Sequence, residues 1–445
     1  MEIVDCSDRY CVVGAGPSGL AAAKNFRQQG VLVECFERED DVGGTWYYGR
    51  PSSSVYASTH LISSKRLTQF TDFPMPDDYP AFPSHAQALA YLRAYARQHQ
   101  LERDICFSTE VQRVEPVDGQ WLVTLSGNQP RRRYRGVVIA NGHHREPLWP
   151  DFPGEFTGTT LHAHDYKTPD VLQGRRVLVV GAGNSGCDIA VESAQHAAAT
   201  FHSLRRGYHY LPKFLLGRPI DQCGLWLQRW HLPLWLRRWV SAQLVRVAVG
   251  SPQQYGLPAP DHRLLASHPV INSHILYCAG HGMLRVKPDV ERLCGDRVRF
   301  VDGSEEAIDV LVCATGYQLS FPFLDPQHLN WRDDLPQLFL HAFHPLDDRL
   351  YVAGMIQPNG GLWRLTDYQT QLMARFVAAA EQGLPVAARF RRLKAGPAPD
   401  LLGGIAVVRS PRHRLEVDYY TYRRVLKKYL ELFAAGTSSR SQNAS

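Results

Sequence analysis

Two glycine-rich loops constrain the fold of this 445-residue chain more than any other feature. Residues 14–19 (GAGPSG) follow the apolar run 10–13, and residues 181–186 (GAGNSG) follow the apolar run 177–180. Each loop leads into a stretch of small and apolar residues, so each predicts a strand, a tight turn and the start of a helix. In such a unit the glycines let the backbone approach a pyrophosphate, which lies at the positive end of the helix dipole. A single GxGxxG match is weak support, but two matches in this context predict two dinucleotide sites.

The residue at the end of the next predicted strand distinguishes the two ligands. The strand expected at residues 31–37 ends on Glu37, whose carboxylate can accept hydrogen bonds from both ribose hydroxyls and would repel a 2′-phosphate. The corresponding strand at residues 200–204 is followed by Arg205 and Arg206, and guanidinium groups suit phosphate oxygens. The alternative for Glu37 is a solvated glutamate at a strand end. We therefore expect FAD or NAD on the first loop and NADPH on the second.

Composition and charge are those of an ordinary globular enzyme of the cytoplasm. Hydrophobic residues make up 44% of the chain and the net charge is +6, so no nucleic-acid partner is predicted. The nine cysteines form no CxxC pair and predict neither a redox-active disulfide nor a metal site. Cys187, in the first turn after the second loop, is interpreted as a small packing residue rather than a reactive thiolate. The pattern at residues 1–5 predicts no secretory signal, and no apolar run is long enough to predict a membrane span.

The order of these segments predicts an α/β fold of two nested Rossmann-like dinucleotide-binding domains. The FAD-binding domain is expected to be discontinuous, at residues 1–170 and 309–435, with a Pro- and Gly-rich linker near residues 146–158. The NADPH-binding domain, residues 171–308, is inserted into it. Residues 436–445 are small and polar and are predicted to be disordered.

An insertion in the second domain, at about residues 215–260, is rich in tryptophan and arginine. Within it Trp226, Trp230, Trp235 and Trp239 alternate with arginines. We expect this segment to pack on the second domain or to cover a substrate tunnel as a lid. Peripheral contact with a membrane interface is the alternative.

Between the two loops, residues 156–166 (FTGTTLHAHDY) match the pattern FxGxxxHxxxY. By this segment and its place just before the second loop, the chain resembles the flavin-containing monooxygenases along nearly its whole length. Five further segments, three before and two after residues 156–166, are similar to motifs of that family and occur in the family's order. They are 43–46 (GGTW), 71–74 (TDFP), 77–80 (DDYP), 313–317 (CATGY) and 417–422 (VDYYTY). The related Baeyer–Villiger enzymes carry a tryptophan at the end of the linker motif. This chain has Tyr166 and Lys167 there, which favours the flavin-containing monooxygenase branch.

The resemblance implies which residues hold each cofactor. For FAD these are Gly14, Gly16, Pro17, Ser18, Gly19, Glu37 at the ribose, Gly44, Thr45, Trp46, and Val111 at the adenine. For NADPH they are Gly181, Gly183, Asn184, Ser185, Gly186, Arg205 and Arg206, the last two at the 2′-phosphate. Ser63 and Thr315 are also expected at the cofactors, and His162 of the linker motif is expected to position the two domains.

The resemblance also implies the reaction, whose chemistry belongs mostly to the flavin. NADPH would reduce the flavin, and O₂ would add at its C4a atom to give a hydroperoxide. A soft nucleophile, an amine nitrogen or a sulfide, would then take the distal oxygen. The expected partners are therefore a small nucleophilic substrate and O₂, and the protein keeps the site dry and preorganised. No side chain is assigned as catalytic, because the reactive species forms on the flavin.

One departure from the family bears on this step. Many members carry an asparagine whose amide faces the flavin C4a atom, whereas this chain has Ile62 in the segment 62–65 (ISSK). Isoleucine has no hydrogen-bond donor on its side chain. Either Ser63 or the NADP⁺ amide supplies the donor, or the protein is an uncoupled NADPH oxidase that releases H₂O₂. We favour a working monooxygenase; Baeyer–Villiger oxidation of a ketone and a non-catalytic flavin-binding sensor are further alternatives.

Overall fold

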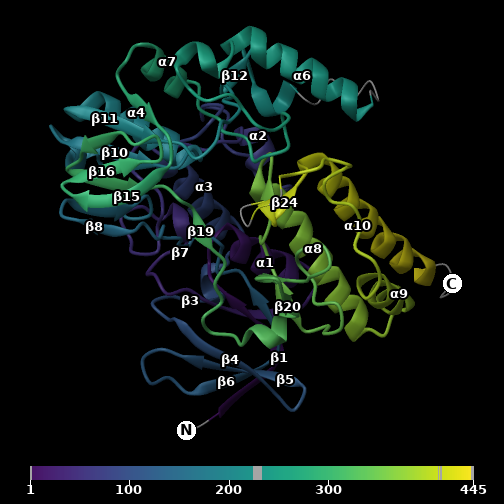
Figure 1. Ribbon diagram of the computed structural model, residues 1–445. Coiled ribbons are helices and arrows are strands. Elements are labelled where there is room, and N and C mark those ends of the chain that lie inside the picture. The colour runs from purple at the N-terminus through teal and green to yellow at the C-terminus, as the bar shows by residue number, and fades with distance from the viewer. Residues whose placement is uncertain (1–2, 224–232, 409, 411–412, 442–445) are drawn as a thin grey trace.

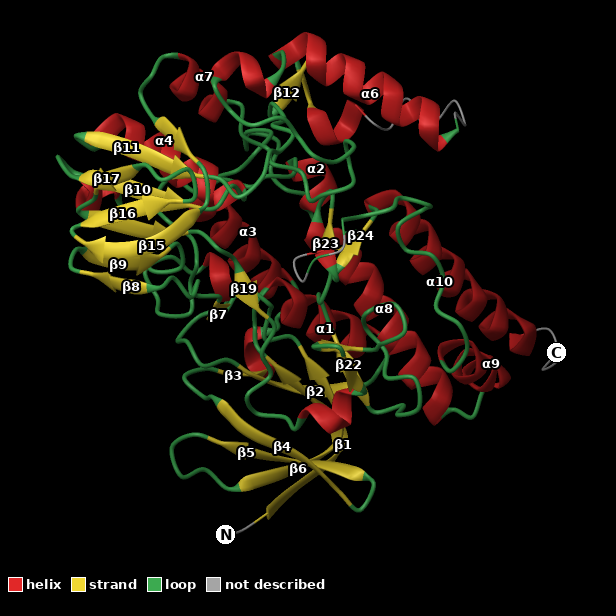
Figure 2. Ribbon diagram, viewed as in Figure 1, coloured by secondary structure: helices red, strands yellow, loops and turns green. Residues whose placement is uncertain are grey.

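The computed structural model describes residues 3–223, 233–408, 410 and 413–441 (Figure 1). One group of strands, around β1, lies at the bottom of the view and another, around β10, at the upper left, while helices α8, α9 and α10 lie at the right (Figure 2). Both strand groups contain parallel strands that alternate with helices along the chain. The predicted α/β fold class is therefore confirmed.

The first unit is built on a seven-stranded sheet in the order β3-β2-β1-β6-β5-β4, with β22 paired to β6. Its parallel core is buried and apolar, as expected for strands that are covered on both faces. The antiparallel β4 and β5 form an arm beyond β6. The strands are β1 (Ile3–Val13), β2 (Leu32–Phe36), β3 (Ile105–Cys106), β4 (Val111–Val117), β5 (Gln120–Leu125), β6 (Arg131–Ile139) and β22 (Leu350–Val352).

The second unit has a five-stranded parallel sheet in the order β14-β11-β10-β18-β9. These strands are β9 (Thr159–His162), β10 (Arg176–Val180), β11 (Ala199–Ser203), β14 (Arg285–Lys287) and β18 (Val310–Cys313). A four-stranded sheet, β17-β16-β15-β8, accompanies it. Its strands are β8 (Gly154–Phe156), β15 (Val290–Gly295), β16 (Arg297–Phe300) and β17 (Glu305–Ala307).

The second unit is inserted into the first, because the chain leaves the first sheet after β6 and returns to it at β22. The second unit is larger than the predicted residues 171–308, since β9 and β18 lie outside those limits yet belong to its sheet. Without β18, one edge of β10 would leave buried backbone groups unpaired. An apolar run alone does not show which sheet it joins, so the sequence placed both strands in the other domain.

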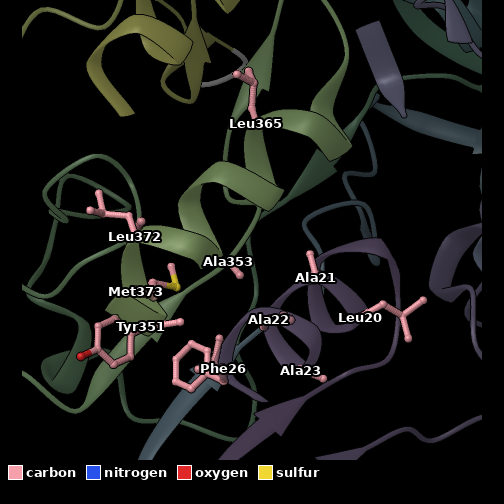
Figure 3. Close-up of a cluster of buried hydrophobic side chains, with 14 of the residues drawn as sticks. Leu20, Ala21, Ala22, Ala23, Phe26, Tyr351, Ala353, Leu365, Leu372 and Met373 are labelled. Atoms are coloured by element: carbon pink, nitrogen blue, oxygen red, sulfur yellow. The ribbon is translucent and has the colours of Figure 1, made fainter. Parts of the chain in front are cut away.

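Helix α1 (Pro17–Gln28), which follows the first glycine loop, packs against α8 (Leu362–Glu381). Figure 3 shows the ring of Phe26 beside that of Tyr351, with side chains of α8 across from them; the two ring centroids are 6.4 Å apart. A buried polar link joins the same helices, since Lys24 Nζ lies 3.2 Å from Asp367 Oδ1. Together these contacts fix the first loop relative to the start of α8.

The remaining helices surround the two units. They are α2 (Lys65–Thr68), α3 (His85–Gln98), α4 (Asn184–His196), α6 (Leu234–Val249), α7 (His274–Gly280), α9 (Pro385–Lys394) and α10 (Tyr419–Ser441). The tail predicted to be disordered from residue 436 is therefore helical as far as Ser441, because a helix gains one hydrogen bond for each residue added to it. Residues 442–445 lie outside the described residues.

Helix α6 belongs to the tryptophan-rich insertion and lies at the edge of the second unit (Figure 1). Ala242 and Val245 pack against a small buried cluster, as the packing interpretation predicts. Trp235 and Trp239 are 70% and 59% exposed, whereas Trp226 and Trp230 lie outside the described residues. Within the described ranges, no helix combines the length and the apolar character needed to cross a membrane.

Candidate cofactor sites

At Gly14 and Gly19 the first glycine loop has no room for a side chain. Gly14 has a φ of +99°, and a Cβ added there would lie 2.9 Å from the carbonyl oxygen of Ala140. A Cβ on Gly19 would lie 1.8 Å from the carbonyl oxygen of Gly14, and one on Gly44 3.0 Å from the Cα of Gly16. The loop therefore keeps the close packing through which a pyrophosphate can approach the start of α1.

Glu37 follows β2 directly and turns back to this loop. Its carboxylate accepts hydrogen bonds from the backbone N–H of Ala15 at 2.7 Å and of Glu39 at 3.0 Å. Burial raises the pKa of Glu37, while these backbone donors and Arg38 act to lower it. With 5% of its surface exposed, Glu37 is not the solvated glutamate of the alternative interpretation.

A cavity opens beside the loop, at the carboxyl ends of the first sheet's strands. Of the residues predicted to hold FAD, those that line it are Gly14, Gly16, Pro17, Ser18, Glu37, Gly44, Thr45, Trp46 and Val111. Gly19 lies behind the loop against Gly14. These residues come from separate parts of the first unit, and a backbone cradle with the buried carboxylate of Glu37 beside it fits FAD.

Several lining residues were missed by the sequence analysis. They are Arg38, Ser52, Thr109, Glu110, residues 140–145, Phe323, Gly354, Leu362 and Trp363. Residues 140–145 follow β6 directly, so their position after a buried parallel strand was a usable signal. Leu362 and Trp363 begin α8, and they reach the cavity only because α8 packs on α1, which no local pattern shows.

Three positions of special interest lie elsewhere. Ser63 is buried, and its hydroxyl shares a 2.8 Å hydrogen bond with that of Thr68. Thr315 donates a 2.5 Å hydrogen bond to the carbonyl of Leu148. The side chain of Ile62 is 37% exposed. Neither Ser63 nor Thr315 lines the cavity beside the first loop, so their contact with a cofactor stays a prediction.

The second glycine loop repeats the geometry of the first. Gly181 has a φ of +109°, and its Cβ would lie 2.5 Å from the carbonyl oxygen of Ala314. A Cβ on Gly186 would lie 2.0 Å from the carbonyl oxygen of Gly181. Asn184 is held from both sides: it donates to the carbonyl of Pro269 and accepts from the N–H of Ile271. Gly183 and Ser185 lie in the same turn, so the predicted NADPH loop is assembled as a second cradle.

The two arginines after β11 differ in their contacts. Arg206 forms an ion pair with Asp261 at 2.7 Å and also contacts His262. Arg205 is exposed, and in the described part of the chain no hydrogen bond or ion pair holds its guanidinium. Arg205 is therefore the arginine that is available to a phosphate.

The linker motif lies where the two units meet, because the ring of its Tyr166 is 5.7 Å from the ring of Tyr56 in the first unit. His162 is fully buried, and its ring lies 5.4 Å from that of Tyr317. Tyr166 donates a 2.5 Å hydrogen bond to Glu192 of α4, and Tyr56 of the first unit donates a 2.7 Å bond to Asp188 of the same helix. These contacts support the predicted positioning role of the motif.

Two strand-turn-helix cradles, one with a buried carboxylate after its second strand and one with an exposed arginine there, are the arrangement expected of a protein that binds two dinucleotides. The family model described as "Flavin-binding monooxygenase-like" matches residues 7–391. The chain belongs to this family of flavin-containing monooxygenases, and it is an FAD-containing, NADPH-dependent enzyme.

Two relatives illustrate the similarity in sequence. The chain is 34% identical over 393 residues to flavin-containing monooxygenase 3 of Macaca mulatta, covering 83% of this chain and 73% of that protein. It is 33% identical over 397 residues to dimethylaniline monooxygenase [N-oxide-forming] 2 of Oryctolagus cuniculus, covering 82% of this chain and 72% of that protein.

Solved structures share the fold. A flavin-containing monooxygenase from Stenotrophomonas maltophilia has a TM-score of 0.63 and 22% identity, covering 86% of this chain and 99% of that chain. The open structure of cyclohexanone monooxygenase has a TM-score of 0.68 and 18% identity, covering 99% of this chain and 98% of that chain. At these identities the likeness supports the nested two-domain fold.

Proposed function

We propose that this protein uses NADPH and O₂ to oxygenate the nitrogen of an amine or the sulfur of a sulfide. The observation that carries the proposal is the pair of unequal cradles: Glu37 is buried at the first loop, and Arg205 is free beside the second. One site is thus suited to a resident FAD and the other to a phosphorylated reductant. Tertiary amines are the first substrates to test, because the rabbit relative is named as an N-oxide-forming dimethylaniline monooxygenase.

The chain's own residues bind and orient the cofactors and exclude water. When bound, FAD would accept the hydride of NADPH and would activate O₂ at its C4a atom. Trp46 and Trp363 line the cavity and meet edge to face, with ring centroids 5.6 Å apart. With FAD bound, these apolar side chains would help to exclude water from the cavity, a condition that favours oxygen transfer over release of H₂O₂.

The test measures how much of the O₂ consumed ends in oxygenated product and how much ends in H₂O₂. A productive turnover consumes NADPH, O₂, a proton and the substrate, and yields NADP⁺, water and the oxygenated substrate. An unproductive one converts NADPH, O₂ and a proton into NADP⁺ and H₂O₂. We expect tertiary amines or thioethers to give products heavier by one oxygen in mass spectrometry. NADPH oxidation that yields only H₂O₂ with every amine, thioether and ketone tested would support the uncoupled oxidase instead.

The oxidase alternative depends on Ile62, which lacks the amide of many family members. Replacing Ile62 with asparagine is expected to lower the H₂O₂ released per NADPH by up to about tenfold, because a new hydrogen bond contributes about 0.5–1.5 kcal/mol. The measurement compares peroxide formed with NADPH consumed, using Ile62→Leu as the matched control. An unchanged ratio in Ile62→Asn would remove this position from the account of coupling.

A further inference from the structure

We propose that Asp221 is a positioning residue for this reaction. It holds the backbone of residues 62–64 beside the cofactor cavity and thereby sets the share of NADPH that ends in oxygenated product. The inference rests on the proposed monooxygenase function and adds to it a residue that lies in the inserted unit, far from both glycine loops in sequence.

Asp221 and Gln222, which both belong to the inserted unit, form hydrogen bonds with Ser64. The Oδ2 atom of Asp221 accepts a 2.6 Å hydrogen bond from the backbone N–H of Ser64. The side-chain amide of Gln222 donates a 3.0 Å hydrogen bond to the Ser64 hydroxyl. The hydroxyl of Tyr420, in α10, donates a 3.0 Å hydrogen bond to the Asp221 carbonyl. Three distant parts of the chain therefore meet at Asp221.

Ser64 is connected to the wall of the cofactor cavity through α2. It precedes α2, whose Leu67 carbonyl is packed against Gly361; a Cβ on Gly361 would lie 2.1 Å from that oxygen. Gly361 is followed by Leu362 and Trp363, which line the cavity. Because this contact leaves no free space, a shift of residues 62–64 would reach the wall formed by the start of α8.

The other side of this segment is anchored separately. Lys65 Nζ donates to the carbonyls of Pro76, Asp77 and Tyr79, and the Leu61 N–H donates to the Pro83 carbonyl at 2.9 Å. Ile62 lies between the Leu61 anchor and Ser64, and its side chain has no polar atom that could form a hydrogen bond. The hydrogen bond from Ser64 to Asp221 therefore restrains the backbone on the side that faces the inserted unit.

The electrostatics fit this role. Burial raises the pKa of Asp221, while the Ser64 donors act to lower it. A carboxylate withdrawn from water is costly unless hydrogen bonds compensate it. The Ser64 N–H compensates Oδ2, whereas the buried Oδ1 has no hydrogen-bond partner among the described residues, so the bond to Ser64 is the one on which this carboxylate depends.

The experiment uses the full-length holoenzyme and three variants. Asp221→Ala removes the acceptor, Asp221→Asn keeps a carbonyl oxygen in its place, and Gln222→Ala removes only the second hydrogen bond. The matched control is Asp400→Ala, because the Asp400 carboxylate also accepts from backbone N–H groups, those of Leu402, Gly403 and Gly404, but does so in an exposed turn away from the cavity.

Two readouts are taken on each protein. With a substrate that the wild type oxygenates, Asp221→Ala is expected to raise the H₂O₂ released per NADPH by about threefold or more, Gln222→Ala by less, and Asp221→Asn is expected to recover much of the coupling. Without NADPH, hydrogen exchange in peptides covering residues 61–68 is expected to be faster in Asp221→Ala. Asp400→Ala is expected to match the wild type in both readouts.

The outcomes separate this inference from the proposed function. If the wild type oxygenates no substrate, the proposed function fails. Hydrogen exchange at residues 61–68 that is the same in Asp221→Ala as in the wild type would show that Asp221 does not hold this segment, and would overturn the inference. If the wild type does oxygenate, a wild-type peroxide ratio in Asp221→Ala overturns the inference alone. If Asp221→Ala does not retain FAD, Gln222→Ala decides the matter by the same two measurements.

Discussion

Replacing Arg205 with alanine is expected to lower kcat/KM for NADPH by about 10- to 100-fold and to leave kcat/KM for NADH within about twofold. The guanidinium is exposed and unpaired among the described residues, so it is free to form charge-assisted hydrogen bonds with a 2′-phosphate. Such bonds are worth about 1.5–3 kcal/mol, and each 1.4 kcal/mol corresponds to a factor of about ten. Steady-state kinetics with both nicotinamide cofactors measure the effect directly.

Arg206 provides the comparison within the same protein. It already pairs with Asp261 at 2.7 Å, so Arg206→Ala is expected to change the preference for NADPH less than Arg205→Ala does. Equal losses with NADPH and NADH in Arg205→Ala would show that this residue does not read the 2′-phosphate. A larger loss of preference in Arg206→Ala would reverse the assignment of the two arginines.

Replacing Gly19 with alanine is expected to lower the FAD content of the purified protein by about tenfold or more. The added Cβ would lie 1.8 Å from the carbonyl oxygen of Gly14, so the loop must move away from the position that suits a pyrophosphate. Flavin absorbance per protein after gel filtration measures the loss. Gly396→Ala is the control, because its nearest neighbour would be 3.4 Å away.

The same substitution in the second loop tests whether the two sites are separate. In Gly186→Ala the Cβ would lie 2.0 Å from the carbonyl oxygen of Gly181. This variant is expected to keep its FAD but to have a KM for NADPH raised by about tenfold or more. A loss of FAD in Gly186→Ala, or full FAD in Gly19→Ala, would contradict the assignment of one cofactor to each loop.

The parts of the fold and site that depend on local pattern could be predicted from the sequence. The two glycine loops, with Glu37 after the first and Arg205 and Arg206 after the second, could be placed from spacing within single strand-turn-helix units, whereas the burial of Glu37 and the exposure of Arg205 are seen only in the structure. The nested order of the two units also followed, because the second loop and its helix lie between two segments of the first sheet.

The parts that depend on tertiary contacts could not be predicted. Strands β9 and β18 join the inserted sheet through pairing between distant segments, which an apolar run does not encode. Leu362 and Trp363 line the cavity because α8 docks on α1. The hydrogen bond between Asp221 and Ser64 spans 157 residues and belongs to no motif. Sequence pattern therefore located the two glycine loops and did not show which distant segments complete the cavity.

The most direct test of the central claim is turnover under ¹⁸O₂ with NADPH and a tertiary amine or thioether that stimulates NADPH oxidation. The account predicts one ¹⁸O atom in each molecule of N-oxide or sulfoxide, with product formed in proportion to the NADPH consumed. Recovery of the label only in H₂O₂, or a product whose oxygen comes from water, would contradict it.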